Sequence, residues 1–84
     1  MTITPDQCRA ARALLDISQD ELATMAKVGK STVRSFESGE RTPIANNLAA
    51  IAASLHAAGV EFIPENGGGA GVRLAKRQKT KSRK

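Results

Sequence analysis

The chain has few aromatic residues and one cysteine. Its 84 residues include two Phe, no Trp and no Tyr, and Cys8 is the only cysteine. The interior must therefore be aliphatic, and an internal disulfide or a zinc site built from several cysteines is excluded. No apolar run approaches the roughly 20 residues that a membrane span needs, and residues 1–5 do not resemble a signal peptide. We expect a cytoplasmic protein with no membrane partner.

The positive charge is concentrated near the C-terminal end. The formal net charge is +5, and seven of the 13 basic residues fall within residues 73–84, which contain no acidic residue. The first 72 residues are slightly acidic, with six basic residues against eight acidic ones. Residues 76–84 are expected to form a flexible basic tail. This tail either improves solubility or neutralises nucleic-acid phosphates in a sequence-independent way.

Two capping boxes predict the starts of two helices. Thr4 with Gln7, and Ser18 with Glu21, place a hydroxyl three residues before a side chain that can reach back to the cap. Pro5 suits the first helical position. We expect the second helix to end near Ala26, and the apolar faces to include Cys8, Ala11, Leu14 and Leu15 in the first helix and Leu22, Met25 and Ala26 in the second.

A third helix is predicted from Lys30 to about Glu37. Gly29 can serve as its N-cap, and Gly39 can supply the left-handed residue that ends it. Val33 and Phe36, spaced three residues apart, are expected to face inward. The opposite side then presents a stripe of cations and hydroxyls, namely Lys30, Ser31, Arg34 and Ser35.

The rest of the chain predicts a fourth helix and a hairpin. The helix begins near or shortly after Pro43 and stops at Gly59. Val60–Ile63 and Gly71–Leu74 are β-prone and flank a glycine-rich turn. The expected fold is mainly α, with about four helices and a C-terminal β-hairpin. Its parts are a helical domain (1–58), the hairpin (59–75) and the basic tail (76–84).

Two short helices joined by about three residues are typical of the helix-turn-helix, which places its second helix in the DNA major groove. The segments Ser18–Ala23, Val28 and Ser31–Gly39 resemble the Xre/Cro family of phage-repressor-like DNA-binding proteins. The resemblance extends roughly from Thr4 to Leu55. It implies a lambda-repressor-like domain that recognises double-stranded DNA.

The resemblance also implies roles for particular residues. Lys30 and Arg34 would donate hydrogen bonds to guanine O6 and N7. Gln19, at a helix N-terminus, would hydrogen-bond a DNA phosphate with help from the helix dipole. Arg12 and Glu37 match an ion pair that links the first and third helices. The implied DNA contacts are Gln19, Lys30, Ser31, Arg34 and Ser35, with Ser38 and Arg41 on the backbone.

Two positions depart from the family pattern. Lys27 stands where the family often has Gly in a left-handed turn, and Gly29 stands where it usually has a Ser or Thr cap. The alternative interpretation of the whole stripe is a solvated cationic face on a structural helix.

These observations predict a sequence-specific transcriptional regulator that acts as a homodimer on a pseudo-palindromic site. Repression is favoured because occupying a promoter is sufficient for it, and activation through a direct contact with the polymerase stays open. The alternative is an antitoxin or adaptor, which binds a protein partner and uses DNA binding to regulate its own synthesis. RNA binding is a third possibility, and the scarcity of aromatic residues disfavours it. The hairpin either packs on its own helices or forms the dimer contact through Val60, Phe62, Ile63, Val72 and Leu74.

Residues that resemble a reactive site have simpler interpretations. His56 lacks a carboxylate or cysteine at ligand spacing and is read as a surface or helix-end residue. Cys8 lacks a recognisable base partner and is read as a small core residue. Asn66–Gly69 lacks the Lys-Ser/Thr of a phosphate-binding loop and is read as a turn. We expect no enzymatic activity, no metal and no cofactor.

Overall fold

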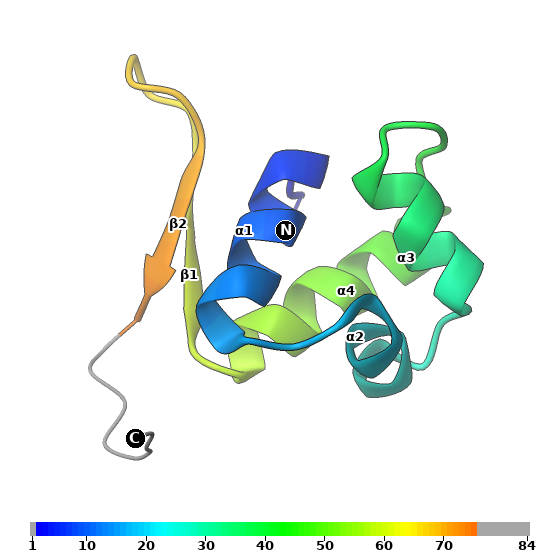
Figure 1. Cartoon of the computed structure of the whole chain (residues 1–84). Helices are drawn as coiled ribbons and strands as arrows, with labels where there is room; N and C mark the ends of the chain where they lie inside the picture. Colours follow the sequence, from blue (N-terminus) through cyan, green and yellow to red (C-terminus); the bar gives the residue numbers. More distant parts are fainter. Residues whose placement is uncertain (1, 76–84) are drawn as a thin grey trace.

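The computed structural model describes residues 2–75, which form four helices followed by an antiparallel hairpin (Figure 1). The predicted mainly helical fold is confirmed. The predicted basic tail, 76–84, lies outside the described residues. In chain order the elements are α1 (Pro5–Leu15), α2 (Gln19–Ala26), α3 (Lys30–Glu37), α4 (Ala45–Ala57), β1 (Val60–Ile63) and β2 (Gly71–Leu74).

Both predicted capping boxes form. The Gln7 N–H donates to Thr4 Oγ1 at 3.0 Å while the Thr4 N–H donates to Gln7 Oε1 at 2.9 Å. The Glu21 N–H donates to Ser18 Oγ at 2.9 Å, and the Ser18 N–H donates to Glu21 Oε1 at 2.8 Å. Because these bonds satisfy backbone donors that a helix leaves without partners, α1 and α2 begin where the sequence predicts.

Left-handed residues end α1 and α2. Asp16 has φ 58° and Lys27 has φ 59°. The next residue in each case donates its N–H to a carbonyl in the last turn of the helix. The Ile17 N–H donates to Arg12 O at 3.1 Å, and the Val28 N–H donates to Ala23 O at 3.0 Å. Lys27 thus takes the conformation that favours Gly, and the departure noted in the sequence leaves the turn intact.

The core is aliphatic apart from Phe36 and Cys8, and it lies among the four helices and beneath the start of β1. Leu22, Val33, Ile51 and Leu55 have no exposed surface, and the small Ala52 allows close helix approach. The buried apolar set is Ile3, Cys8, Ala11, Leu22, Ala23, Ala26, Val33, Phe36, Ile51, Ala52, Leu55 and Val60.

Two residues that the sequence placed on the apolar helix faces are exposed. Leu14 is 43% exposed and Met25 is 42% exposed. One residue turns a helix by about 100°, so Met25 lies well to one side of the face that Ala23 and Ala26 bury. Leu14 lies beyond Ala11 on the side away from the buried centre of α1. The sequence prediction was wrong for both because it treated every apolar residue near the face as part of it.

The hairpin lies alongside α1 with its tip projecting past the helices (Figure 1). Its strands pair Val60 with Leu74 and Phe62 with Val72. These four side chains share one face and pack against the core, and Val60 has no exposed surface. The other face carries an ion pair, Arg73 Nε to Glu61 Oε1 at 2.7 Å.

This packing bears on the predicted dimer contact, which stays a prediction for the partly exposed Phe62, Val72 and Leu74. Four of the five proposed residues pack against the core of their own chain, which is the alternative arrangement considered for the hairpin. Val60 in particular has no surface left for a second copy. The alternation of strand side chains leaves Ile63 as the one member of the set on the face opposite the core.

Gln7 fastens the hairpin to α1, a role that sequence analysis missed. This side chain is 5% exposed, and its Nε2 donates to Ile63 O at 3.2 Å and to Gly71 O at 2.9 Å. Its Oε1 accepts the capping hydrogen bond from Thr4. Both amide protons and the amide oxygen of Gln7 therefore have hydrogen-bond partners. This one residue links the start of α1 to both strands.

We expect Gln7→Leu to loosen the hairpin, because the two strand carbonyls and the Thr4 N–H lose their partner. The cost is roughly 1–3 kcal/mol. Amide hydrogen exchange should accelerate more in Val60–Ile63 and Gly71–Leu74 than in α4. Asn66→Ala, in the exposed turn, is the control. Equal protection of the strand amides in Gln7→Leu and the unsubstituted chain would contradict the linking role.

Candidate nucleic-acid interface

The α2–α3 unit is held by a short turn and by the inner side of α3. Residues 27–29 join the two helices, and Val28 packs against the core. Gly29 is the N-cap of α3 without a side-chain hydrogen bond, as its lack of a side chain requires. Val33 and Phe36 are buried, which fixes the rotation of α3 about its own axis. Its opposite side must then face outward.

That outward side carries the four predicted base-contacting residues. Lys30, Ser31 and Arg34 are exposed, and Ser35 is partly exposed. Residues four apart lie one above the other on a helix, so Lys30 and Arg34 form one row and the two serines form the next. Helix α3 lies on the side of the molecule opposite the hairpin (Figure 1). The stripe is accessible to a large partner.

A groove of about 500 Å³ lies beside this stripe. It runs between α3, the 38–44 connection and the start of α4. Arg41 contributes a cation, and several hydroxyl and amide groups contribute hydrogen-bond donors that suit phosphate oxygens. The lining residues are Ser31, Thr32, Ser35, Glu40, Arg41, Thr42, Pro43, Ile44 and Asn47. The groove adds Thr42 and Asn47 to the candidate contacts, and neither was singled out from sequence.

Ser38 is placed differently from the other predicted contacts. Its hydroxyl donates to Ser35 O at 3.0 Å and accepts from the Glu40 N–H at 3.3 Å. A hydroxyl has one proton, and here that proton is used to close the end of α3. Ser38 therefore shapes the helix end and the following turn, where Gly39 has φ 81° as predicted.

Lys30 has an acidic neighbour that sequence analysis did not identify. Its Nζ lies 3.4 Å from Asp20 Oδ2, and the two side chains are 64% and 61% exposed. An exposed pair of this kind contributes at most about 1 kcal/mol. Asp20 would matter more for binding to a nucleic acid, because a carboxylate beside the stripe repels phosphates and competes with them for Lys30.

We expect Asp20→Asn to strengthen binding to all duplexes several-fold. The ratio of the affinity for the specific site to the affinity for non-specific DNA should fall. The released Lys30 gains a sequence-independent attraction to phosphates, and one negative charge is lost. Asp16→Asn is the matched control, because it removes the same charge at a position where Asn also tolerates the left-handed backbone. Titration of matched and scrambled duplexes gives the measurement. An unchanged affinity for both would contradict the competing role of Asp20.

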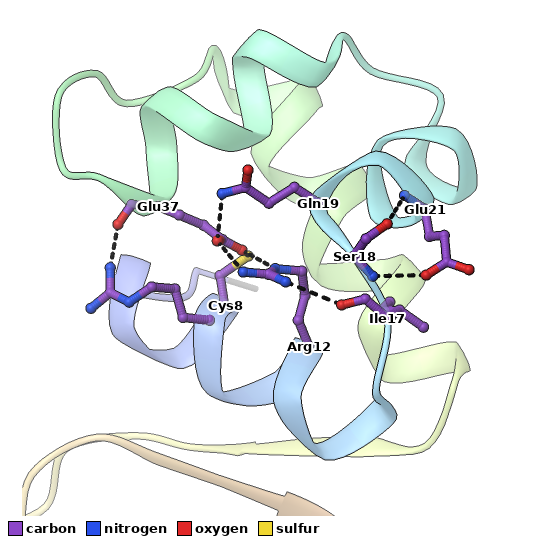
Figure 2. Close-up of polar contacts among 8 residues, drawn as sticks. Cys8, Arg12, Ile17, Ser18, Gln19, Glu21 and Glu37 are labelled. Atoms are coloured by element: carbon purple, nitrogen blue, oxygen red, sulfur yellow. Dashed lines mark hydrogen bonds and ion pairs between the residues drawn. The ribbon is translucent and has the colours of Figure 1, made fainter.

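A buried carboxylate joins α1, α2 and α3 (Figure 2). Glu37, the last residue of α3, is 2% exposed. Arg12 donates from Nε to Glu37 Oε2 and from Nη2 to Oε1, both at 2.7 Å, and its Nη1 donates to Ile17 O at 3.1 Å. Cys8 Sγ lies 3.1 Å from Oε2, and Gln19 Nε2 lies 3.0 Å from Oε1.

The electrostatics of this cluster keep the pair ionised. Burial favours a raised pKa for Glu37, but hydrogen bonds from Arg12, Gln19 and Cys8, together with the Arg12 charge, outweigh it and lower the pKa. The hydrogen bond with Glu37 raises the pKa of Arg12. Burial, and then the contact with Glu37, raises the pKa of the Cys8 thiol, which therefore stays protonated and donates. Cys8 is a core residue, in agreement with its buried position.

Arg9 adds a second link between α1 and the end of α3. Its guanidinium donates to the main-chain oxygen of Glu37 and to the Asp6 carboxylate. The C-terminal end of α3 and the middle of α1 are thus connected through both the side chain and the backbone of Glu37.

Other chemistry-bearing residues take structural positions. His56 Nδ1 lies 3.3 Å from Val60 O, at the junction of α4 and β1. Among residues 2–75, no three His, Cys, Asp or Glu side chains group as a metal site would require. Over the same residues, no helix has both the length and the apolar character needed to span a bilayer.

The sequence model of the helix-turn-helix family matches residues 9–58, more than half of the chain. The chain belongs to the Xre/Cro-like helix-turn-helix family. As a member of a family of DNA-binding regulators, which are generally not enzymes, it is a DNA-binding transcriptional regulator. The match runs from within α1 to the end of α4 and leaves the hairpin outside. A comparison with curated proteins gives no match.

Proposed function

We propose that this Xre/Cro-like protein is a repressor that binds a pseudo-palindromic operator as a homodimer, with α3 in the major groove of each half-site. The observation that carries the proposal is the two-sided character of α3. One side is buried through Val33, Phe36 and Glu37. The other side presents Lys30 and Arg34 to solvent.

The side chains of the stripe suit different tasks. Arg34 presents a planar fork that matches guanine O6 and N7, and Lys30 donates to the same acceptors as a point charge. Ser31 and Ser35 donate to or accept from either base and discriminate little. Arg41 and Gln19, on either side of α3 in the chain, contact the phosphate backbone and fix the register of the helix.

Homodimerisation supplies the specificity that one short helix lacks, since one recognition helix contacts few base pairs. With four apolar strand residues directed at their own core, the contact between copies uses the outer face and edges of the hairpin. That face carries Glu61 and Arg73, which lie opposite each other in the pairing, and Ile63. A two-fold axis beside it places Glu61 of one copy near Arg73 of the other.

Selection of binding sites from random duplexes, followed by titration of the best site over a salt series, tests the function. We expect an inverted repeat, two copies of the chain per duplex, and an affinity that falls steeply with salt. Sedimentation of Ile63→Lys tests the dimer: a monomer mass, with a circular-dichroism spectrum like that of the unsubstituted chain, supports the hairpin contact. Failure of every selected duplex to outcompete bulk genomic DNA would refute sequence-specific binding.

A further inference from the structure

The Gln19 side chain is oriented by a residue of the recognition helix. Gln19 is the first residue of α2, and its Nε2 lies 3.0 Å from Glu37 Oε1. In Figure 2 the amide nitrogen points to Glu37 and the amide oxygen points away from it. An ionised carboxylate only accepts hydrogen bonds. Glu37 therefore dictates which end of the Gln19 amide faces the protein.

Glu37 is well suited to this task because it is itself held in place. Arg12 contacts both carboxylate oxygens, and the Cys8 thiol contacts one of them. With 2% of its surface exposed, the Glu37 side chain is enclosed by protein. The Glu37 oxygen that accepts the hydrogen bond from Gln19 therefore has a fixed position and a negative charge.

The orientation leaves one amide proton of Gln19 for a ligand. The nitrogen carries two protons, and one is given to Glu37. A phosphate oxygen accepts hydrogen bonds and cannot use the outward amide oxygen, so the second Nε2 proton is the side-chain donor available to it. The positive charge of Arg12, paired with Glu37, permits one nitrogen to lie between two anions.

We infer that Glu37 is a positioning residue for DNA binding, which orients Gln19 so that its second Nε2 proton donates to a backbone phosphate. This inference rests on the proposed function. It has a geometric consequence, since Glu37 terminates the helix that carries Lys30 and Arg34. The phosphate contact of Gln19 and the base contacts of Lys30 and Arg34 are then both positioned by α3.

A double-mutant cycle on duplex affinity tests the inference. Gln19→Met keeps the length of the side chain and removes the donor, and we expect it to weaken all duplexes about tenfold. Glu37→Gln should weaken binding by a similar factor in the unsubstituted background and by little in the Gln19→Met background. The melting temperature should fall with Glu37→Gln in both backgrounds, because the Arg12 guanidinium loses the negative charge and one of its two acceptor oxygens either way. Glu65→Gln, in the hairpin turn, is the charge-matched control.

Side-chain amide NMR of the unsubstituted chain gives a readout that does not depend on variants folding. In the free protein, one Gln19 Nε2 proton should exchange slowly, and addition of the selected duplex should protect the second proton. Neither proton responding to duplex would overturn the inference.

The outcomes separate the inference from the function on which it rests. If the unsubstituted chain binds no duplex, the proposed function fails. If it binds but Gln19→Met has full affinity, or Glu37→Gln weakens binding equally in both backgrounds, Glu37 does not act through Gln19. The function then stands and the inference falls.

Discussion

Glu37→Ala is expected to remove a large part of the stability of this domain. Breaking a buried ion pair by deleting one partner costs roughly 3–5 kcal/mol, a large part of the 5–15 kcal/mol that holds a typical small domain folded. The substitution leaves the Arg12 guanidinium without its carboxylate partner, and it also removes the acceptor for Cys8 and Gln19. Thermal unfolding followed by circular dichroism should show a midpoint lowered by roughly 12–40 °C.

Glu65→Ala is the matched control, because it removes an exposed carboxylate from the hairpin turn. Its midpoint should lie close to that of the unsubstituted chain, since most surface substitutions change stability by less than about 0.5 kcal/mol. If Glu37→Ala melted within a few degrees of Glu65→Ala, the ion pair would not stabilise the fold.

The same carboxylate predicts a dependence of stability on pH. Its pKa is lowered in the folded chain, so its stabilising contribution is fully present above the unfolded-state pKa, about 4.3 for a glutamate. That contribution is lost as the pH falls below this value toward the folded-state pKa. The gap in unfolding free energy between the unsubstituted chain and Glu37→Gln should therefore narrow between pH 5 and pH 2. A gap that stays constant across this range would contradict the lowered pKa.

Helix boundaries were predictable from sequence because their causes are local. The two capping boxes each join residues three apart, and Gly29 and Gly39 lie at the ends of the helix they delimit. Such patterns need no knowledge of the tertiary fold. The spacing of Val33 and Phe36 likewise fixes which side of α3 faces out, and with it the candidate reading stripe.

The buried cluster and the packing of the hairpin were not accessible in this way. Glu37 meets Cys8 and Gln19 across 29 and 18 residues of chain, and Gln7 meets the strands across 56 and 64. No short pattern encodes contacts at these separations. The alternation of Val60 and Phe62 predicts an apolar strand face, but such a face is the same whether the chain's own helices or a second copy cover it.

Arg34→Ala is expected to flatten base preference at one position of each half-site by roughly 1–3 kcal/mol. Arg34 is exposed on α3, one turn from Lys30, on a helix held by buried residues. If its guanidinium bonds both guanine acceptors, removing it lowers affinity for the preferred site more than for a site with the wrong base. Titrating duplexes that differ only at that base pair gives the measurement.

Two further variants distinguish the recognition of a base from a general attraction to the DNA charge. Arg34→Lys keeps the positive charge but lacks the planar fork, so it should retain the salt dependence of binding while losing much of the discrimination. Arg41→Ala, in the groove beside α3, should weaken all duplexes about equally and reduce the salt slope by about 1. Because the two arginines differ in the acceptors they are proposed to meet, their variants should produce different patterns. Equal loss on every duplex from Arg34→Ala would instead make Arg34 another phosphate contact and move the reading of bases to Lys30 and the serines.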